Sequence, residues 1–362
     1  MADKNIQDLG FRIQQARKML GLSLRAVADA TGNAVSHTAI AQYEKGAMFP
    51  SSTNLIALAR VLRQPVDFFF RPMRAHLIEP IRFRKKTVLG KQEQEAIRLR
   101  AVDFFERYYE IEDIMGEERP FHNPLPEKPV RTPREAGGMA RKLREEWGLG
   151  VDPLPNLHEL MELKGIKVCE VPSKNQAFDG FCSATERGPV VVLAAWLNRN
   201  LLRKRATEVH ELAHVMARVP GDLEEKEEEK IVWSFAGELL LPEEAFVDAF
   251  GKNRHSLSIP ELIHIKHLFG ASIMSIIFRA RSLELIDESL YREFWKHANK
   301  HQWRSQGEPG DEGYQGNESH SRFRQLVLRA AVEERITRSK AAALLHTDID
   351  TIRKQVGVII QE

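Results

Sequence analysis

The chain has 362 residues, of which 43% are hydrophobic and 29% charged, with a formal net charge of +2. This composition is typical of a folded protein of two or three domains and excludes a wholly disordered or fibrous chain. The longest apolar run, residues 190–197, has eight residues, whereas a membrane-spanning helix needs about 20. The chain has only two cysteines, Cys169 and Cys182, which predicts a protein without disulfides. The N-terminus lacks an apolar signal core, so we expect a cytoplasmic protein with no membrane partner.

The charge is distributed unevenly, which indicates different functions in different segments. Residues 1–75 carry ten Lys or Arg and five Asp or Glu, whereas residues 222–229 carry six acids and one lysine. Composition and periodicity divide the chain into five predicted segments. They are a bundle of short helices (1–75), a long helix with a Pro-rich linker (76–133), a mixed α and β domain (134–290), a partly disordered linker (291–320) and a helical module (321–362).

The first segment has the pattern of a helix–turn–helix. Ser23 and Ser36 are placed to cap successive helices, and Gly32 allows the left-handed turn between them. Ile40 and Tyr43 direct the second helix into the core, so that its other face points outward to the base edges of DNA. The candidate DNA-binding residues, for base edges or for phosphates, are Ser23, Arg25, Ser36, His37, Thr38, Gln42 and Lys45.

The stretches GFRIQQARKMLGLSLRAVA and AIAQYEKGAMFPSSTNLIALARVL resemble the Xre/Cro-type helix–turn–helix repressors. This resemblance implies that residues 1–75 bind double-stranded operator DNA. A homodimer that reads two half-sites about 34 Å apart is then expected. Residues 90–116 repeat Ile97, Ala101, Phe105 and Tyr109 at intervals of four, which predicts one amphipathic helix. Its apolar stripe packs either on the chain's own core or on a second subunit, where it would serve as the dimer helix.

The sequence His210-Glu211-Leu212-Ala213-His214 is an H-E-x-x-H motif. On a helix, positions i and i+4 lie on one face, so both imidazoles can bind one zinc ion while Glu211 accepts a proton from water. A catalytic zinc site needs a third protein ligand, and the following segment offers five glutamates. We favour Glu229, because it enters the next predicted helix, with Glu228 as the second choice.

The stretches PNLHELMELKGIKVCEV, GPVVVLAAWLN, RKRATEVHELAHVMA and FAGELLLPEEAF resemble, in this order, the ImmA/IrrE-type metallo-endopeptidases over about residues 134–285. The resemblance implies a minimal zincin, with a small twisted sheet packed on the H-E-x-x-H helix. It implies zinc ligands at His210 and His214, a general base at Glu211, and the third ligand in the acidic segment. Family members usually have an acidic residue, Ala, and Asn or Asp where this chain has Ile231, Val232 and Trp233.

The predicted fold class is therefore α+β, mainly α. It comprises an N-terminal helix–turn–helix bundle, a central zincin whose strands are IKVCEV, DGFCSA and PVVVLAA, and a C-terminal helical module. Both cysteines lie on these strands and are interpreted as buried thiols. The histidines that follow the core, His255, His264 and His267, are interpreted as structural or surface residues, with stabilisation of an oxyanion as the alternative.

The two domains together predict a DNA-binding transcriptional regulator with a fused zinc-dependent endopeptidase that cleaves itself or a partner repressor. The alternative is the antitoxin of a toxin–antitoxin pair. It would bind its operator and its cognate toxin, and the zincin fold would serve as a scaffold with little or no proteolysis. The C-terminal module has a net charge of +3 and helix–turn–helix-like spacing, which suits partner binding or DNA contact.

Overall fold

A computed structural model describes residues 2–71, 89–319 and 322–357. The chain forms two compact units. The first consists of Met1–Arg119, Val171–Phe178 and Ser321–Glu362, and the second of Pro120–Glu170 and Asp179–His320. Helices dominate, and the strands form one small sheet, so the predicted mainly α, α+β class is confirmed. The predicted boundary at residue 75 lies outside the described residues.

The first unit begins with a bundle of short helices. They are α1 (Ala2–Met19), α2 (Leu24–Ala30), α3 (His37–Glu44), α4 (Ser52–Val61) and the 3-10 turn η1 (Val66–Phe70). The Ser23 and Ser36 hydroxyls accept the N–H groups of Ala26 and Ala39 and so begin α2 and α3 as predicted. Ile40 and Tyr43 are buried. Gly32 has φ +67°, a left-handed conformation that glycine adopts without strain and that turns the chain after α2.

Helix α5 (Lys91–Met115) confirms the long helix, and it ends at Gly116 in the left-handed conformation. Leu99 joins the core of the N-terminal bundle, whereas Tyr108 and Ile111 join a second core. Its apolar stripe therefore packs within its own chain. This is the first of the two predicted alternatives, packing on the chain's own core.

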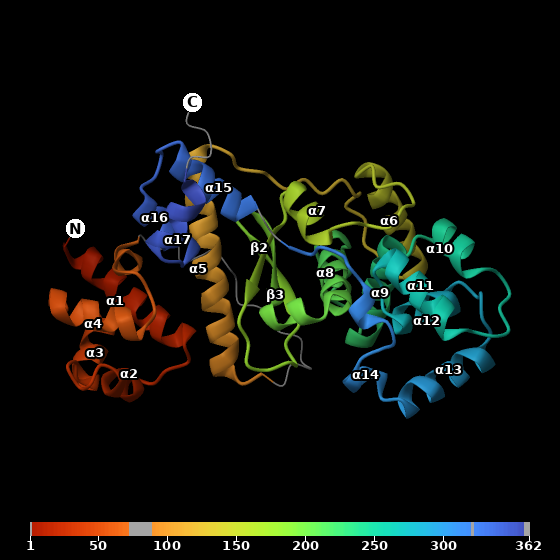
Figure 1. The fold of residues 1–362 in the computed structure, drawn as a ribbon, viewed down its shortest axis with the longest axis horizontal. Helices are drawn as coiled ribbons and strands as arrows, with labels where there is room; N and C mark the ends of the chain where they lie inside the picture. The colour runs from red at the N-terminus through yellow and green to blue at the C-terminus, as the bar shows by residue number, and fades with distance from the viewer. Residues whose placement is uncertain (1, 72–88, 320–321, 358–362) are drawn as a thin grey trace. The chain divides into compact units, whose positions relative to one another are not determined.

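The second core joins α5 to the C-terminal helices α15 (Arg322–Val332), α16 (Arg338–Leu345) and α17 (Ile349–Val356), which lie beside it in Figure 1. Lys340 at the start of α16 pairs with Asp67 of η1 (3.1 Å) and with Glu110 of α5 (2.7 Å). The predicted C-terminal module thus belongs to the same compact unit as the N-terminal bundle.

The second unit is built around a three-stranded sheet. Its first elements are α6 (Pro133–Glu146), α7 (Leu157–Leu163), β1 (Lys167–Val171), β2 (Gly180–Thr185), β3 (Gly188–Ala194), η2 (Ala195–Arg199), α8 (Leu201–Met216) and α9 (Glu225–Leu240). The strand order is β1-β3-β2, and β2 pairs antiparallel to β3. A Cβ atom at Gly180 would lie 3.1 Å from the Thr207 side chain, so glycine allows α8 to approach β2 closely.

The unit continues with α10 (Glu243–Phe250), α11 (Ile259–Phe269), α12 (Ile273–Ser282), α13 (Glu288–Lys300), α14 (Trp303–Gln306) and η3 (Asp311–Gly313). In the described residues no single helix is long and apolar enough to cross a membrane, although α11 and α12, bent by 93°, pass such a test together.

The structure differs from the prediction of a partly disordered linker at 291–320. Within the described part of that segment, α13, α14 and η3 are regular elements. The Glu308 carboxylate accepts the N–H groups of Ile273 (2.6 Å) and Met274 (3.0 Å) at the start of α12 and pairs with buried Lys266. The segment is poor in apolar residues, but its carboxylates satisfy donors that would otherwise be buried without acceptors.

Candidate metal centre and DNA-binding surface

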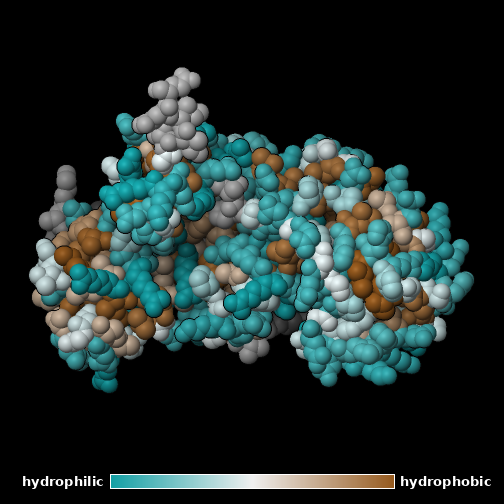
Figure 2. Space-filling model, viewed as in Figure 1, coloured by the Kyte–Doolittle hydropathy of each residue, from teal (hydrophilic) through white to brown (hydrophobic). Residues whose placement is uncertain are grey.

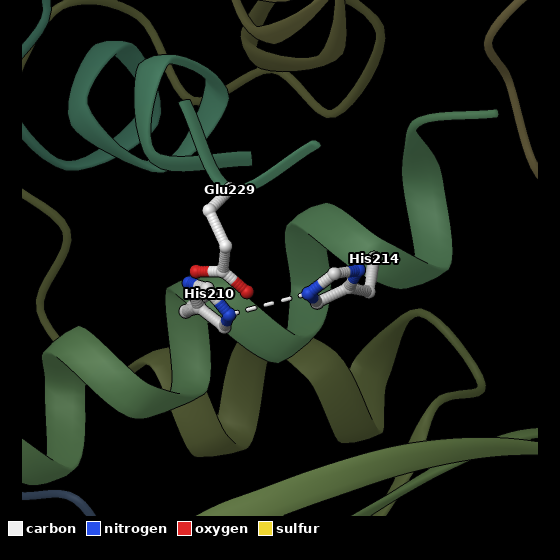
Figure 3. A group of neighbouring side chains, drawn as sticks. All are labelled: His210, His214 and Glu229. Carbon is white, nitrogen blue, oxygen red and sulfur yellow. Dashed lines mark hydrogen bonds between the residues drawn. The ribbon is translucent and has the colours of Figure 1, made fainter. Parts of the chain in front are cut away.

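Helix α8 brings the two histidines of the motif together. Asn200 caps the helix by accepting the Arg203 N–H, and an uninterrupted run of turns leads to the motif. His210 is buried and His214 is partly exposed. Their Nε2 atoms lie 3.2 Å apart, and a dashed line joins the two rings in Figure 3. The predicted geometry, with two imidazoles one turn apart on one face, is therefore present.

The neighbouring helix α9 supplies a carboxylate to the same place. In Figure 3 the Glu229 side chain points toward His210, and one ligand atom from each of Glu229, His210 and His214 lies within 4.8 Å of the others. Glu228, the second choice, instead lies against the opposite side of His214, with its Oε1 atom 3.7 Å from Nδ1. The remaining glutamates of the acidic segment are exposed: Glu224, Glu225 and Glu227.

Most of the acidic segment is helical, because α9 begins at Glu225 and so includes Glu229 as predicted. Carboxylates in the first turn interact favourably with the positive end of the helix dipole, which offsets their mutual repulsion. The start at Glu225 places Glu229 in the second turn of a packed helix, so its backbone is held in place.

This donor set fits a zinc ion. Zinc–nitrogen bonds of about 2.0–2.1 Å in a tetrahedral arrangement require two nitrogen ligands to be about 3.3 Å apart. The observed 3.2 Å between the His210 and His214 Nε2 atoms matches that spacing. Two imidazoles and one carboxylate are also the ligand types of a catalytic zinc site, in which the fourth position stays open.

Two further residues surround the ligands. Glu211, the predicted general base, is buried on α8 next to His210 in sequence. Trp233 lies one helical turn after Glu229 on α9. Its ring centroid is 4.6 Å from that of His210, and the planes are tilted by 48°. By contrast, Ile231 and Val232 are buried in the apolar core.

A buried polar pair joins α8 to α7, with Glu208 two residues before His210. Glu208 Oε1 is 3.1 Å from His158 Nδ1, and both side chains are fully buried. Burial raises the pKa of the Glu208 carboxyl to about 8, against the opposing effect of Lys204. Burial, assisted by the Lys204 charge, lowers the pKa of His158 to about 4. Burial thus favours the uncharged form of both groups.

Arg205 anchors α8 to the segment that was predicted as a linker. Its guanidinium donates to the Glu318 carboxylate and to the carbonyl oxygens of Leu154 (2.7 Å) and Gly270 (3.0 Å). Glu318 also accepts the Leu157 N–H (2.8 Å) at the start of α7. Burial, together with nearby Glu208, raises the pKa of Glu318 to about 7. Sequence reasoning missed this carboxylate, because its partners lie far away in the chain.

The candidate DNA-binding residues share an accessible surface of the helix–turn–helix. All seven are exposed: Ser23, Arg25, Ser36, His37, Thr38, Gln42 and Lys45. Glu44, the acidic residue of α3, is held by Arg17 of α1 at 2.6 Å and is largely buried. Its charge is thus compensated internally, which leaves the exposed face of α3 without an acid that would repel phosphates.

The other candidate residues do not join the metal centre. His255 and His264 are exposed, and His267 Nε2 lies 2.7 Å from the Gly310 carbonyl oxygen. These contacts favour the structural or surface interpretation. Cys169 is buried as predicted, whereas Cys182 is partly exposed.

Two family models match the chain. Residues 13–69 match a helix–turn–helix family, and residues 161–281 match the IrrE N-terminal-like domain. No curated protein matches the chain. The two matches confirm both resemblances in their predicted order. The protein therefore combines a helix–turn–helix domain that binds double-stranded DNA with a metallopeptidase-type domain.

Proposed function

We propose that this fusion of a helix–turn–helix with an IrrE-like domain is a cytoplasmic transcriptional regulator with zinc-dependent endopeptidase activity. Its substrate is the chain itself or a partner repressor. One observation carries the enzymatic half of the proposal. The H-E-x-x-H helix and α9 bring two imidazoles and a carboxylate within 4.8 Å of one another, which is the ligand set of a hydrolytic zinc site.

In this proposal His210, His214 and Glu229 hold the metal. A bound zinc ion supplies a Lewis acid that lowers the pKa of water to about 7. The Glu211 carboxylate accepts a proton from the attacking water and delivers it to the nitrogen of the departing peptide. Glu228 lies beside Nδ1 of His214, where its negative charge favours the ring orientation that turns Nε2 toward the metal.

The helix–turn–helix places this activity on DNA. Exposed His37, Thr38 and Gln42 on α3 are positioned for base edges, and Arg25 and Lys45 for phosphates. Cleavage of the regulator or of a partner repressor would separate DNA binding from the rest of the molecule and relieve transcriptional control.

A homodimer is part of the same proposal. Hydrophobic residues gather over α1–α4 on the face drawn in Figure 2. The domain also leaves Phe49 51% and Ile56 46% exposed, an apolar surface that a second copy can cover. Sedimentation with and without operator DNA tests this part, and a strictly monomeric protein in both states contradicts it.

The catalytic role is tested with Glu211→Gln in the full-length protein. Intact-mass analysis follows the protein with zinc, alone and mixed with helix–turn–helix repressors. We expect the wild-type protein to produce discrete fragments and Glu211→Gln to produce none. Glu225→Gln, which changes an exposed acid on α9, is the matched control and should cut normally. Fragments of the same mass from Glu211→Gln would remove the proposed mechanism.

The antitoxin alternative is favoured by the C-terminal helices. Helices α15–α17 share a core with α5 and expose Arg338, Arg353 and Lys354, but neither DNA reading by α3 nor peptide hydrolysis uses them. In this second candidate they bind a toxin. Co-expression with the product of a neighbouring gene tests it, and failure to neutralise any such product counts against it.

A further inference from the structure

Helix α9 places two side chains, one turn apart, over the histidines of α8. Glu229 and Trp233 are separated by four residues and so lie on one face of α9. The first belongs to the cluster of candidate ligands, and the second packs its indole against the His210 ring at a centroid distance of 4.6 Å. The same helix face thus supplies a donor atom and an aromatic wall to the site.

The contact restricts the His210 ring. Nε2 of the His210 ring must point toward the metal position that it shares with His214. The Nε2 atoms of the two rings are 3.2 Å apart. An indole is large and rigid, with only two rotatable side-chain bonds, and at this distance it limits rotation of the imidazole away from that direction. Fixing a ligand before the metal arrives reduces the conformational entropy lost on binding.

The same contact also distinguishes the metal-loaded ring from the empty one. A cation within about 6 Å of an aromatic face is attracted by the negative electrostatic potential of that face. Coordination makes the His210 imidazole more positive, so the indole stabilises the loaded site more than the metal-free site. Trp233 is also 39% exposed, so burial in the core does not by itself account for its place beside His210.

We propose that Trp233 is a positioning residue that orients His210 and raises the affinity of this site for zinc. The inference rests on the proposed metal site, but it concerns affinity and geometry rather than peptide hydrolysis. An orienting partner of a ligand typically contributes about 10–100-fold in metal affinity. We therefore expect Trp233→Ala to weaken zinc binding at least about tenfold, whereas Trp233→Phe, which keeps a ring face, stays close to the wild type.

The experiment titrates zinc into the full-length protein in competition with a chromophoric chelator. Trp295→Ala is the control, because Trp295 is another partly exposed tryptophan of the same unit, on α13, outside the ligand cluster. Thermal unfolding of each metal-free variant shows how much of any change is lost stability. Cobalt absorption gives a second readout, since weaker orientation of His210 changes the intensity of the visible bands.

Loss of affinity and a changed cobalt spectrum in Trp233→Ala, with near wild-type values in Trp233→Phe and Trp295→Ala, support the inference. Wild-type affinity in Trp233→Ala overturns it. If Trp233→Ala does not fold, Trp233→Leu replaces it, because leucine keeps apolar volume without a ring. A zinc affinity of Trp233→Leu equal to that of Trp233→Phe then overturns the role of the aromatic ring. A wild-type protein that binds no zinc refutes the proposed metal site itself, which is a distinguishable result.

Discussion

Exchanging single carboxylates of α9 for amides separates the proposed third ligand from its neighbour. In Glu229→Gln the side chain keeps its length but loses the negative charge that would face the metal. In Glu228→Gln the same change occurs at a carboxylate whose Oε1 atom lies 3.7 Å from Nδ1 of His214, the ring nitrogen that does not face His210. The two variants change adjacent positions of the same helix, so each serves as the control for the other.

The structure sets the expected magnitudes. Structural zinc sites with four protein ligands bind zinc with a free energy of about 10–16 kcal/mol, which is about 3 kcal/mol for each ligand. Loss of one ligand therefore corresponds to a loss of about 100-fold in affinity. Glu228 is 41% exposed, and its distance from His214 exceeds that of a normal hydrogen bond. Its effect should therefore lie near tenfold, the lower end of the range for residues that orient ligands.

The assay is again competition with a chromophoric chelator, with metal-free thermal unfolding as the check on folding. We expect the zinc dissociation constant to rise about 100-fold for Glu229→Gln and about tenfold for Glu228→Gln. The reverse order would show that Glu228 is the ligand and would refute our reading of the α9 geometry. Equal wild-type affinity in both variants would refute a carboxylate ligand from α9 altogether.

The remaining predictions concern folding and DNA binding. Arg12 and Glu106 form a buried ion pair at 2.6 Å between α1 and α5, so Glu106→Ala should cost about 3–5 kcal/mol in a denaturation experiment, and a loss below about 1 kcal/mol contradicts that burial. Burial lowers the pKa of His158 to about 4, so its contribution to stability is present above pH 6.5 and is lost as the pH falls toward 4. Between pH 7 and pH 5 the wild-type protein should therefore lose stability relative to His158→Asn, by up to about 3 kcal/mol over the whole window. The comparison with this variant is needed because the raised pKa values of Glu208 and Glu318 act in the opposite direction, and equal changes in stability in the two proteins would contradict the assignment. Lys45→Ala should weaken DNA binding for every sequence and reduce the slope of the logarithm of the binding constant against the logarithm of the salt concentration by about one. Gln42→Ala should instead reduce the discrimination between bases at one position of the operator.

Local patterns predicted the elements that position the candidate site. The spacing of His210 and His214 is enough to place both on one helix face, and α5 follows from its apolar periodicity. The helix caps at Ser23 and Ser36 were equally readable, because a hydroxyl acts on a backbone N–H only three residues away.

Other features depend on partners that are distant in sequence. Glu308 and Glu318 lie in a segment of loop-like composition, but they are held by Lys266 and by Arg205, respectively. No pattern in the segment itself signals those pairings. Likewise, the sequence shows only that Trp233 stands where family members usually have Asn or Asp. Its contact with His210 depends on the packing of α8 against α9.

The central claim is that one divalent ion binds between α8 and α9. Crystals of the zinc-loaded protein measured on both sides of the zinc absorption edge test it most directly. The account predicts a single strong anomalous peak in contact with Nε2 of His210, Nε2 of His214 and the Glu229 carboxylate. A zinc-loaded crystal with no peak there, or with its only peak on other side chains, would contradict the metallopeptidase assignment.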